Sequence, residues 1–421
     1  MKTQLNRKTL AESLALLERI IPSRSANPLL TYLSLVLTDA SLVLTGTSGE
    51  VDLRLHLPIR LGRELGSGLH VLVPALPLAQ VVRSLPGSAS VLEVELGRVE
   101  LSLAAATRCL AQGAKATFQT RFSVAEPEGF PEPVFPEPML ALKAQDLLQA
   151  LTHVRYAASN EEYRAVFRGI QLEFSERGLR AVASDGYRLA LYDLELPTLE
   201  GELPQRRLVV PARSVDEMVR VLKAAGGGSE ASRGEPQEVG LGFTDGVLGL
   251  SLNPLPLGST TQAASSEVAS RTEHLEDLEG PLAVQMAVRL MEGEFPDYER
   301  VIPKEFVLEA EAEAEVLKES LKRVSVLADR QNHRVDLFFE ENQLTLRAEG
   351  DYGKGQEELP VRLSGPPMTV SFNARYLLDA LGPTEGTVRL GLSGTQTPAV
   401  IQEGGEGAQS GYLAVVVPLR V

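Results

Sequence analysis

"LVPALPLAQVVRSL", residues 72–85, is nearly repeated by "VVPARSVDEMVRVL", residues 209–222. Both stretches contain Val-Pro-Ala and end in Val-Arg-x-Leu, and their prolines lie 137 residues apart. An apolar stripe that begins at Leu10 returns at Leu147 with the same offset of 137 residues. A repeat of this length is too long for a solenoid unit and indicates a duplicated domain.

Apolar residues at the spacing of a helix face predict six helices. They lie at residues 10–21, 74–85, 147–158, 211–222, 317–328 and 373–381. Asn6 is a candidate N-cap of the first helix, and Ser214 and Glu217 have capping-box spacing near the start of the fourth. Between helices, residues 33–59 and 335–363 alternate apolar and polar side chains, as antiparallel meanders do.

The last two helices fit a third copy of the repeat. The sequence therefore predicts an α+β fold of three similar domains, each with two helices and two antiparallel sheets. We place the domains at residues 1–128, 129–303 and 304–421. Residues 253–281 of the second domain form an insertion rich in Ser, Thr, Ala, Glu and Pro, which we expect to be a mobile loop.

Composition narrows the class of protein. No window approaches the roughly 18 consecutive apolar residues of a membrane span. The single cysteine, Cys109, excludes an internal disulfide framework and favours a reducing, cytoplasmic compartment. The net charge of −15 argues against nucleic-acid binding, but the total does not say where the charges lie.

Nothing in the sequence indicates an active site, a metal site or a cofactor. The five histidines have no paired spacing, and no phosphate-binding or dinucleotide-binding loop is present. Two alternatives stay open from the residues alone. One is an enzyme on a repeated α+β scaffold, which needs convergent His, Asp or Glu side chains, and the other is a monomeric peptide-binding adaptor.

Basic residues lie away from the apolar stripes of the predicted helices. A charged helix face is most often simply solvated, but six helices around a common centre would turn these residues into a basic lining inside an acidic shell. The candidates for such a DNA-facing lining are Arg24, Arg83, Arg155, Arg220, Lys223, Lys322 and Arg323, with Lys318 on the same helix as the last two.

Four motifs occur in order along the repeat. They are "SDGYRLA" at 184–190, "GEFPDYERVIP" at 293–303, "FNARYLLDAL" at 372–381 and "VVVPLRV" at 415–421. With them the chain resembles, over essentially its whole length, the bacterial DNA polymerase III beta subunit family, the replicative sliding clamps.

The resemblance implies a head-to-tail homodimer of three-domain chains that closes a ring around duplex DNA, held without base readout. It implies a non-enzymatic processivity factor without a cofactor. Its partners are the replicative polymerase, the clamp loader, other polymerases and repair proteins, which bind through short peptide motifs.

The resemblance also implies a groove for partner peptides between the second and third domains, and a dimer interface. The groove residues are Ser184, Gly186, Tyr187, Arg188, Leu189, Pro296, Arg300, Val301, Pro398, Val415, Val416, Val417, Pro418, Leu419, Arg420 and Val421. The dimer contacts are Phe118, Val326 and Leu327. We further expect Phe295 and Tyr298 to pin the proline-bracketed linker at 293–303, which is neither a regular helix nor a buried strand.

Overall fold

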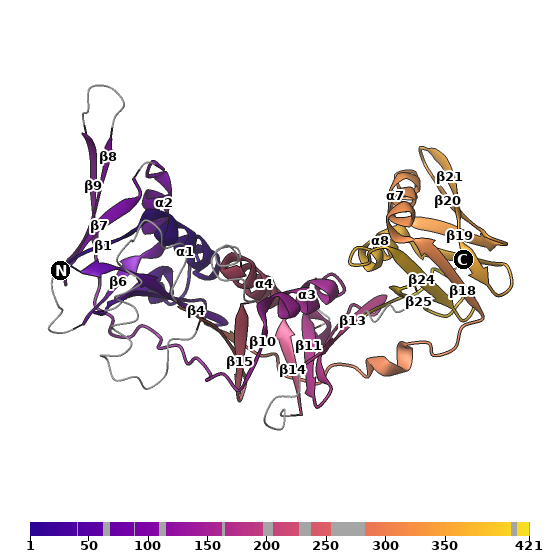
Figure 1. Ribbon diagram of the computed structural model, residues 1–421, viewed down its shortest axis with the longest axis horizontal. Helices are drawn as coiled ribbons and strands as arrows, with labels where there is room; N and C mark the ends of the chain where they lie inside the picture. The colour runs from indigo at the N-terminus through magenta and orange to yellow at the C-terminus, as the bar shows by residue number, and fades with distance from the viewer. Residues whose placement is uncertain are drawn as a thin grey trace. The chain divides into compact units, whose positions relative to one another are not determined.

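A computed structural model of the chain describes most of its residues (Figure 1). The described ranges are 1–39, 41–61, 68–87, 89–108, 115–161, 165–196, 205–226, 237–253, 283–405 and 411–420. The predicted insertion, apart from Asn253, and the groove residue Val421 therefore lie outside the described residues. Across these ranges, no helix is long and apolar enough to cross a membrane.

The chain divides into two compact units. The first unit comprises Met1–Leu148 and Asp216–Leu290, and the second comprises Gln149–Val215 and Met291–Val421. Helices α3 (Ala144–Arg155) and α4 (Ala212–Gly226) contribute residues to both units.

The first unit contains two antiparallel sheets, with strand orders β5-β1-β7-β8-β9 and β10-β15-β16-β17-β4-β3-β2-β6. Its elements are β1 (Lys2–Asn6), α1 (Arg7–Ile20), η1 (Pro28–Thr31), β2 (Tyr32–Leu37), β3 (Ser41–Thr47), β4 (Val51–Pro58), β5 (Arg60–Leu61), β6 (Leu69–Pro74), α2 (Ala75–Ser84), β7 (Val91–Leu96), β8 (Glu100–Arg108), β9 (Lys115–Ser123), β10 (Leu140–Lys143), β15 (Glu238–Thr244), β16 (Val247–Leu252) and β17 (Ala283–Arg289).

The second unit also contains two antiparallel sheets, with strand orders β14-β11-β12-β13-β26-β25-β24-β18-β22 and β21-β20-β19-β23. Its elements are η2 (Ala165–Arg168), β11 (Gly169–Ser175), β12 (Gly178–Ser184), β13 (Arg188–Glu195), β14 (Arg206–Pro211), η3 (Tyr298–Val301), β18 (Leu308–Glu313), α7 (Ala314–Ser325), β19 (Arg334–Glu340), β20 (Gln343–Gly350), β21 (Gly353–Pro360), β22 (Arg362–Ser364), β23 (Met368–Asn373), α8 (Ala374–Leu381), β24 (Thr387–Leu392), β25 (Ala399–Glu403) and β26 (Tyr412–Val416).

Each of the six predicted helices is present, and their apolar stripes are buried except at Ala328, which lies beyond the end of α7 and is partly buried. In α1, the Asn6 side chain accepts hydrogen bonds from the N–H groups of Lys8 and Thr9, as a capping residue should. The predicted starts of α2 at Pro74 and of α4 at Pro211 are each one residue too early, because α2 begins at Ala75 and α4 at Ala212. Pro211 is the last residue of β14, so Ser214 lies inside the first turn of α4 and does not cap it.

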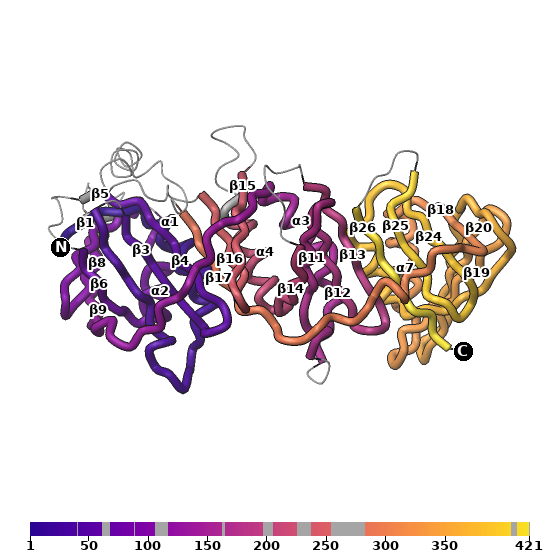
Figure 2. The backbone as a smooth tube through the Cα atoms, turned by 90° about the horizontal axis from the view of Figure 1, so that it is seen from below, coloured from indigo at the N-terminus to yellow at the C-terminus, as the bar shows by residue number. Residues whose placement is uncertain are grey.

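Two linkers cross the strand faces of their own units (Figure 2). The first strap, residues 126–139, passes so close to β15 that a Cβ on Gly242 would lie 2.1 Å from the Glu137 carbonyl oxygen. The second strap, residues 291–303, buries Phe295 and Tyr298 against the nine-stranded sheet, which confirms that these side chains pin the linker. Both straps are therefore built into the sheets that they cross.

Candidate functional site

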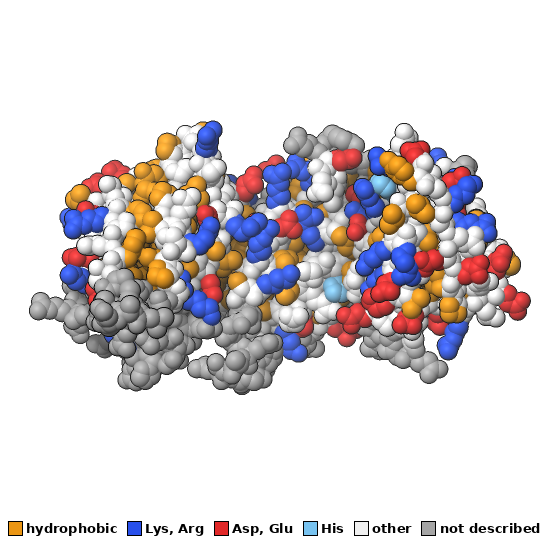
Figure 3. Space-filling view, turned by 90° about the horizontal axis from the view of Figure 1, so that it is seen from above, with side chains coloured by type: hydrophobic (Ala, Val, Ile, Leu, Met, Phe, Trp, Pro, Cys, Tyr) orange, Lys and Arg blue, Asp and Glu red, His pale blue; other side chains and the backbone are white. Residues whose placement is uncertain are grey.

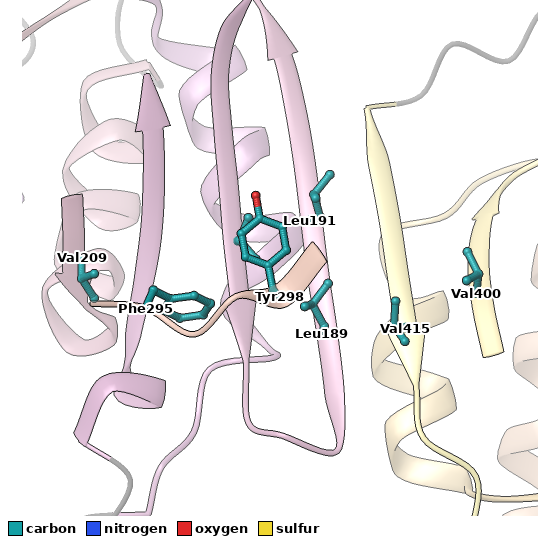
Figure 4. Close-up of a cluster of buried hydrophobic side chains, with 8 residues drawn as sticks. Leu189, Leu191, Val209, Phe295, Tyr298, Val400 and Val415 are labelled. Carbon is teal, nitrogen blue, oxygen red and sulfur yellow. The ribbon is translucent and has the colours of Figure 1, made fainter. Parts of the chain in front are cut away.

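The second strap shares an apolar cluster with two of the predicted groove residues. Figure 4 shows the Tyr298 ring close to the strand that carries Leu189 and Leu191, and the Phe295 ring between Tyr298 and Val209. Phe295 meets Tyr298 edge to face, with ring centroids 6.4 Å apart. The buried members of the cluster are Val182, Leu189, Leu191, Val209, Phe295, Tyr298, Val400 and Val415.

A tight turn leads into β13 and presents Tyr187. The Ser184 hydroxyl donates to the Arg188 carbonyl at 2.9 Å and accepts from the Gly186 N–H at 3.1 Å. Asp185 accepts from the N–H groups of Tyr187 and Arg188 at 2.9 and 3.0 Å. Gly186 has a φ of +86°, a conformation that glycine adopts without strain. The turn is thus fixed by its own side chains, and Tyr187 stays 48% exposed.

Arg188 is held on all sides. Its Nε donates to Asp185 at 3.1 Å, a second ion pair joins it to Asp379 of α8, and its guanidinium lies 4.7 Å from the Tyr376 ring centroid. Burial disfavours its charge, but the hydrogen bonds and charges of Asp379 and Asp185 raise its pKa above the ordinary value. Tyr187 stacks on the same Tyr376 ring with centroids 6.2 Å apart.

Strand β26 and the residues after it lie beside this turn. Leu189 is opposite Val415 and Arg188 is opposite Val416 in the antiparallel pairing of β13 with β26. The Val417 N–H donates to the Tyr187 carbonyl at 2.9 Å. The residues of the first and last predicted motifs therefore meet, although they are more than 220 positions apart in the sequence.

The predicted groove residues differ in exposure. Leu189, Val415, Val416 and Pro418 are buried, so they support the surface from beneath. Ser184 is also buried, while Arg188, Pro398 and Leu419 are partly buried. The exposed members are Gly186, Tyr187, Pro296, Arg300, Val301, Val417 and Arg420. We define the junction surface as the exposed and partly buried members of this set around Tyr187 and Val417, together with the strap residues Pro296, Arg300 and Val301.

Sequence reasoning missed Tyr376 and Asp379 of α8. The motif at 372–381 contains both, but their contacts with Tyr187 and Arg188 depend on tertiary structure. It also missed Tyr156, whose hydroxyl lies 2.7 Å from that of Tyr412. Burial raises the pKa of Tyr156 well above its ordinary value, so this hydroxyl pair stays protonated.

The first unit contains a junction built in the same way but with different chemistry. There β4 pairs with β17, and the Arg289 N–H donates to the Glu50 carbonyl at 2.9 Å, as Val417 does to Tyr187. At the repeat offset of 137 residues, Asp52 and Arg54 replace Leu189 and Leu191. Among the described residues, the first junction therefore carries charges at two positions where the second junction has buried leucines.

The predicted DNA-facing residues fall into two groups. Figure 3 shows Lys and Arg side chains interspersed with Asp and Glu on one face. Arg83, Arg220 and Arg323 form ion pairs with Glu18, Glu217 and Glu357, and Arg155 donates to the Ala212 carbonyl. Arg24, Lys223 and Lys322 are exposed, and the described part of the chain provides none of them with an ion pair.

Lys318 does not belong with Lys322 and Arg323. Its side chain is buried, and its ammonium donates to the Thr384 carbonyl at 2.5 Å and to Glu315 at 2.8 Å. The expectation that Lys318 lies on an exposed basic face is therefore wrong. The long side chain turns inward and reaches a backbone acceptor, the Thr384 carbonyl.

Of the predicted dimer contacts, Phe118 and Val326 are exposed and Leu327 is partly buried. Phe118 lies in the edge strand β9 and is 36% exposed. Val326, just after α7, is 77% exposed, and a Cβ on Gly355 of the edge strand β21 would lie 3.2 Å from Leu327. No group of three or more His, Cys, Asp or Glu residues that could hold a metal is found among the residues described.

Comparisons with known proteins agree over the whole chain. Residues 1–123, 141–236 and 299–418 match the family profiles for the N-terminal, central and C-terminal domains of the DNA polymerase III beta subunit. The beta sliding clamp of Pseudomonas putida is 26% identical over 427 residues and that of Synechococcus elongatus 27% over 426 residues, each covering 100% of both chains.

Solved structures give the same fold. A DnaN sliding clamp from Pseudomonas aeruginosa bound to griselimycin has a TM-score of 0.80 at 22% identity and covers 100% of both chains. The DNA polymerase III beta subunit of Thermotoga maritima has a TM-score of 0.77 at 22% identity and covers 100% of this chain and 99% of its own.

The fold and the three consecutive matches define a sliding clamp of three repeated α+β domains. The chain belongs to the DNA polymerase III beta subunit family, and it functions as a DNA sliding clamp. The domain limits at residues 128 and 303 stay predictions.

Proposed function

We propose that two copies of this chain associate head to tail into a ring around duplex DNA. The ring tethers the replicative polymerase, the clamp loader, other polymerases and repair proteins by short peptides that bind the junction surface. In this proposal the chain has no catalytic activity and no cofactor, works in the cytoplasm, and leaves ATP use to a separate loader. The observation that supports the ring is a strand pairing that occurs once in each unit and that two edge strands of the described chain, β9 and β21, can form between two copies.

The two junctions within the chain follow one rule. In the first unit β17 pairs with β4, and in the second unit β26 pairs with β13, both antiparallel. One partner in each junction, β17 or β26, pairs antiparallel with the strand before it, β16 or β25, and β9 pairs with β8 in the same way. Strands β4 and β13 follow β3 and β12, as β21 follows β20. By this rule β9 of one copy pairs with β21 of another.

The rule also supplies a register. In each sheet, a residue can be followed to its partner on the next strand and so on to the edge. The rows that begin three positions before the first residues of α1, α3 and α7 end at Gln119, Gln285 and Leu413, respectively. Gln285 lies opposite Arg54 of β4, and Leu413 lies opposite Leu191 of β13. Arg54 and Leu191 each pair with the residue nine positions earlier in the preceding strand. In β21 the residue that pairs in this way is Gln356, so Gln356 is equivalent to Arg54 and Leu191. We therefore propose that Gln119 lies opposite Gln356 of the second copy.

The faces of the two strands support this register. Gln119 lies opposite Ala104 on one face of its sheet, whereas Phe118 lies opposite the buried Ala105 on the other. In β21, Gln356 is exposed and Leu359 is buried, so Gln356 also lies on the outer face. A slip by one residue would place Phe118 opposite Gln356, so that a side chain on the inner face of one strand would meet one on the outer face of the other.

Cysteine cross-linking tests the ring and the register together. The variant Gln119→Cys with Gln356→Cys, in a Cys109→Ser background, should form covalent dimers on mild oxidation, because opposite residues lie within disulfide reach. Phe118→Cys with Gln356→Cys is the matched control and should stay uncross-linked. Efficient cross-linking of the control alone, or a monomer by light scattering with no ring in negative-stain micrographs, contradicts the proposal and favours the monomeric adaptor.

Partner binding rests on the chemistry of the junction surface. Tyr187 and Val417 are exposed apolar groups beside the fixed charge of Arg188, a combination that anchors short peptides with large apolar side chains. A fluorescein-labelled peptide ending in Leu-Phe should therefore bind, with one peptide for each chain in titration calorimetry. Two peptides for each chain would mean that the first junction also binds, against its charged composition.

A further inference from the structure

A row of alternating charges lies under the second strap. In the strand registers, Arg207 of β14 is opposite Glu173 of β11, Glu173 is opposite Arg180 of β12, and Arg180 is opposite Asp193 of β13. Arg180 donates to both oxygens of Asp193, at 2.6 and 3.0 Å, and Arg207 Nε lies 3.7 Å from Glu173. These four residues, the charge row, therefore cross four neighbouring strands.

The Tyr298 hydroxyl connects the strap to the middle of this row. It donates to Glu173 at 3.0 Å and accepts from Nη1 of Arg180 at 3.5 Å. The same Nη1 lies 3.6 Å from Glu299, the next residue of the strap. The Tyr298 side chain is only 6% exposed, and its burial raises the pKa of the hydroxyl to about 12, so it is protonated and able to donate at neutral pH.

The other side chains that hold the strap are apolar: Met291 and Ile302 also pack against the cluster that contains Phe295 and Tyr298. The only regular element of the strap is the single turn η3, and its first backbone contact with the sheet is the bond from the Met291 N–H to the Val209 carbonyl, at 2.8 Å. Beyond the buried rings of Phe295 and Tyr298, it exposes Pro296, Arg300 and Val301. The Arg300 side chain is 85% exposed and pairs with Asp297 of the same strap, at 2.6 Å.

We propose that the charge row and Tyr298 form a lock that positions the second strap, and with it Arg300 and Val301, for partner peptides that never touch the lock. The inference rests on the proposed peptide site. An aromatic ring without a hydroxyl can fill the apolar cluster in several orientations. A hydroxyl that is hydrogen-bonded to two charged groups restricts the ring to one orientation. When binding residues are already ordered, the peptide does not have to order them, and the free-energy cost of binding is smaller.

The test compares two tyrosine-to-phenylalanine variants. Tyr298→Phe removes the lock hydroxyl and keeps the buried ring. Tyr352→Phe is the matched control, because its hydroxyl also bonds to an arginine, Arg330, at 2.8 Å, but on a different hairpin of the second unit. One readout is the rate of trypsin cleavage after Arg300, followed by the appearance of a fragment that begins at Val301. The other is the affinity for the labelled peptide ending in Leu-Phe.

Tyr298→Phe should speed cleavage after Arg300 and weaken peptide binding by roughly three- to tenfold, the effect expected from losing one typical intramolecular hydrogen bond. Tyr352→Phe should change neither. Arg180→Met should resemble Tyr298→Phe, and the two changes together should cost less than the product of the separate losses, because they break the same lock.

Three outcomes would overturn the inference, and they differ from one another. Unchanged cleavage in Tyr298→Phe means that the hydroxyl does not hold the strap. Faster cleavage with unchanged peptide affinity means that the strap is held but does not position the peptide site. A wild-type protein that does not bind the peptide removes the proposed site itself, and this inference with it.

Discussion

The backbone N–H of Val417 donates a hydrogen bond of 2.9 Å to the carbonyl oxygen of Tyr187. It ties the C-terminal segment to the turn that opens β13. A second bond, from the Leu419 N–H to the Ser371 carbonyl at 2.8 Å, ties the same segment to the end of β23. The segment after β26 is therefore part of the junction surface and is held from both sides.

Removal of residues 418–421 should abolish peptide binding and leave the oligomer intact. The deletion takes away the buried Pro418 and the Leu419 anchor, but it does not touch β9 or β21. Fluorescence anisotropy with the labelled peptide and light scattering of the truncated protein check both parts. Removal of Val421 alone, the last of the predicted groove residues, should weaken binding less than the longer deletion does. Unchanged affinity after the longer deletion would show that the junction surface is assigned incorrectly.

Val417→Arg should weaken peptide binding by at least about tenfold, because a charge would have to lose water under an apolar ligand. Arg289 already occupies the equivalent position of the first junction, with the same backbone hydrogen bond, so the fold accommodates the substitution. We expect stability to change by less than about 0.5 kcal/mol, as for other exposed sites. Val417→Met, which stays apolar, should bind within about twofold of wild type. Equal losses of peptide affinity in both variants would mean that the size of the side chain at position 417 matters, and not its charge.

Lys322→Ala should weaken binding to a short DNA duplex more than Arg323→Ala does. Arg323 is already engaged by Glu357 at 2.7 Å, whereas Lys322 is exposed and has no ion pair among the described residues. If Lys322 contacts phosphate, its loss should reduce the slope of log affinity against log salt by about 1. The measurement is anisotropy of a labelled duplex at several salt concentrations. A salt slope equal to that of wild type would exclude Lys322 from the DNA-facing set.

His56 should make the first unit less stable in acid. Burial, with the Arg54 charge nearby, lowers the pKa of His56 to about 4, below the value of about 6.5 expected in the unfolded chain. The unfolded state therefore binds the extra proton first, and stability falls as pH drops from about 6.5 towards 4, by at most about 3 kcal/mol. Asp52 opposes this trend, because burial raises its pKa.

His56→Gln isolates the contribution of the histidine. The difference in urea midpoint between wild type and His56→Gln should shrink or reverse between pH 7.5 and pH 4.5, in favour of the variant. If the urea midpoints of the two proteins changed with pH in parallel, the pKa of His56 would not differ between the folded and unfolded states.

Local patterns determined most of the secondary structure. The six helices follow from apolar spacing, and the Asn6 cap follows from side-chain chemistry, because both depend on residues within one or two turns. The start of α4 was mispredicted because Pro211 reads equally well as the first residue of a helix and as the last residue of a strand. Lys318 was misplaced because a long side chain on a helix surface can reach a buried acceptor that the sequence does not reveal.

The repeat, the helices and the family motifs can be read from residue types and short spacings. The contacts of Tyr376 and Asp379 with Tyr187 and Arg188, and those of Tyr298 with a row of charges from adjacent strands, become visible only in the folded protein. Such contacts depend on strand register, which joins residues tens to hundreds of positions apart. No local spacing encodes those partners, so the lock and the two sides of the junction surface emerge only when the sheets form.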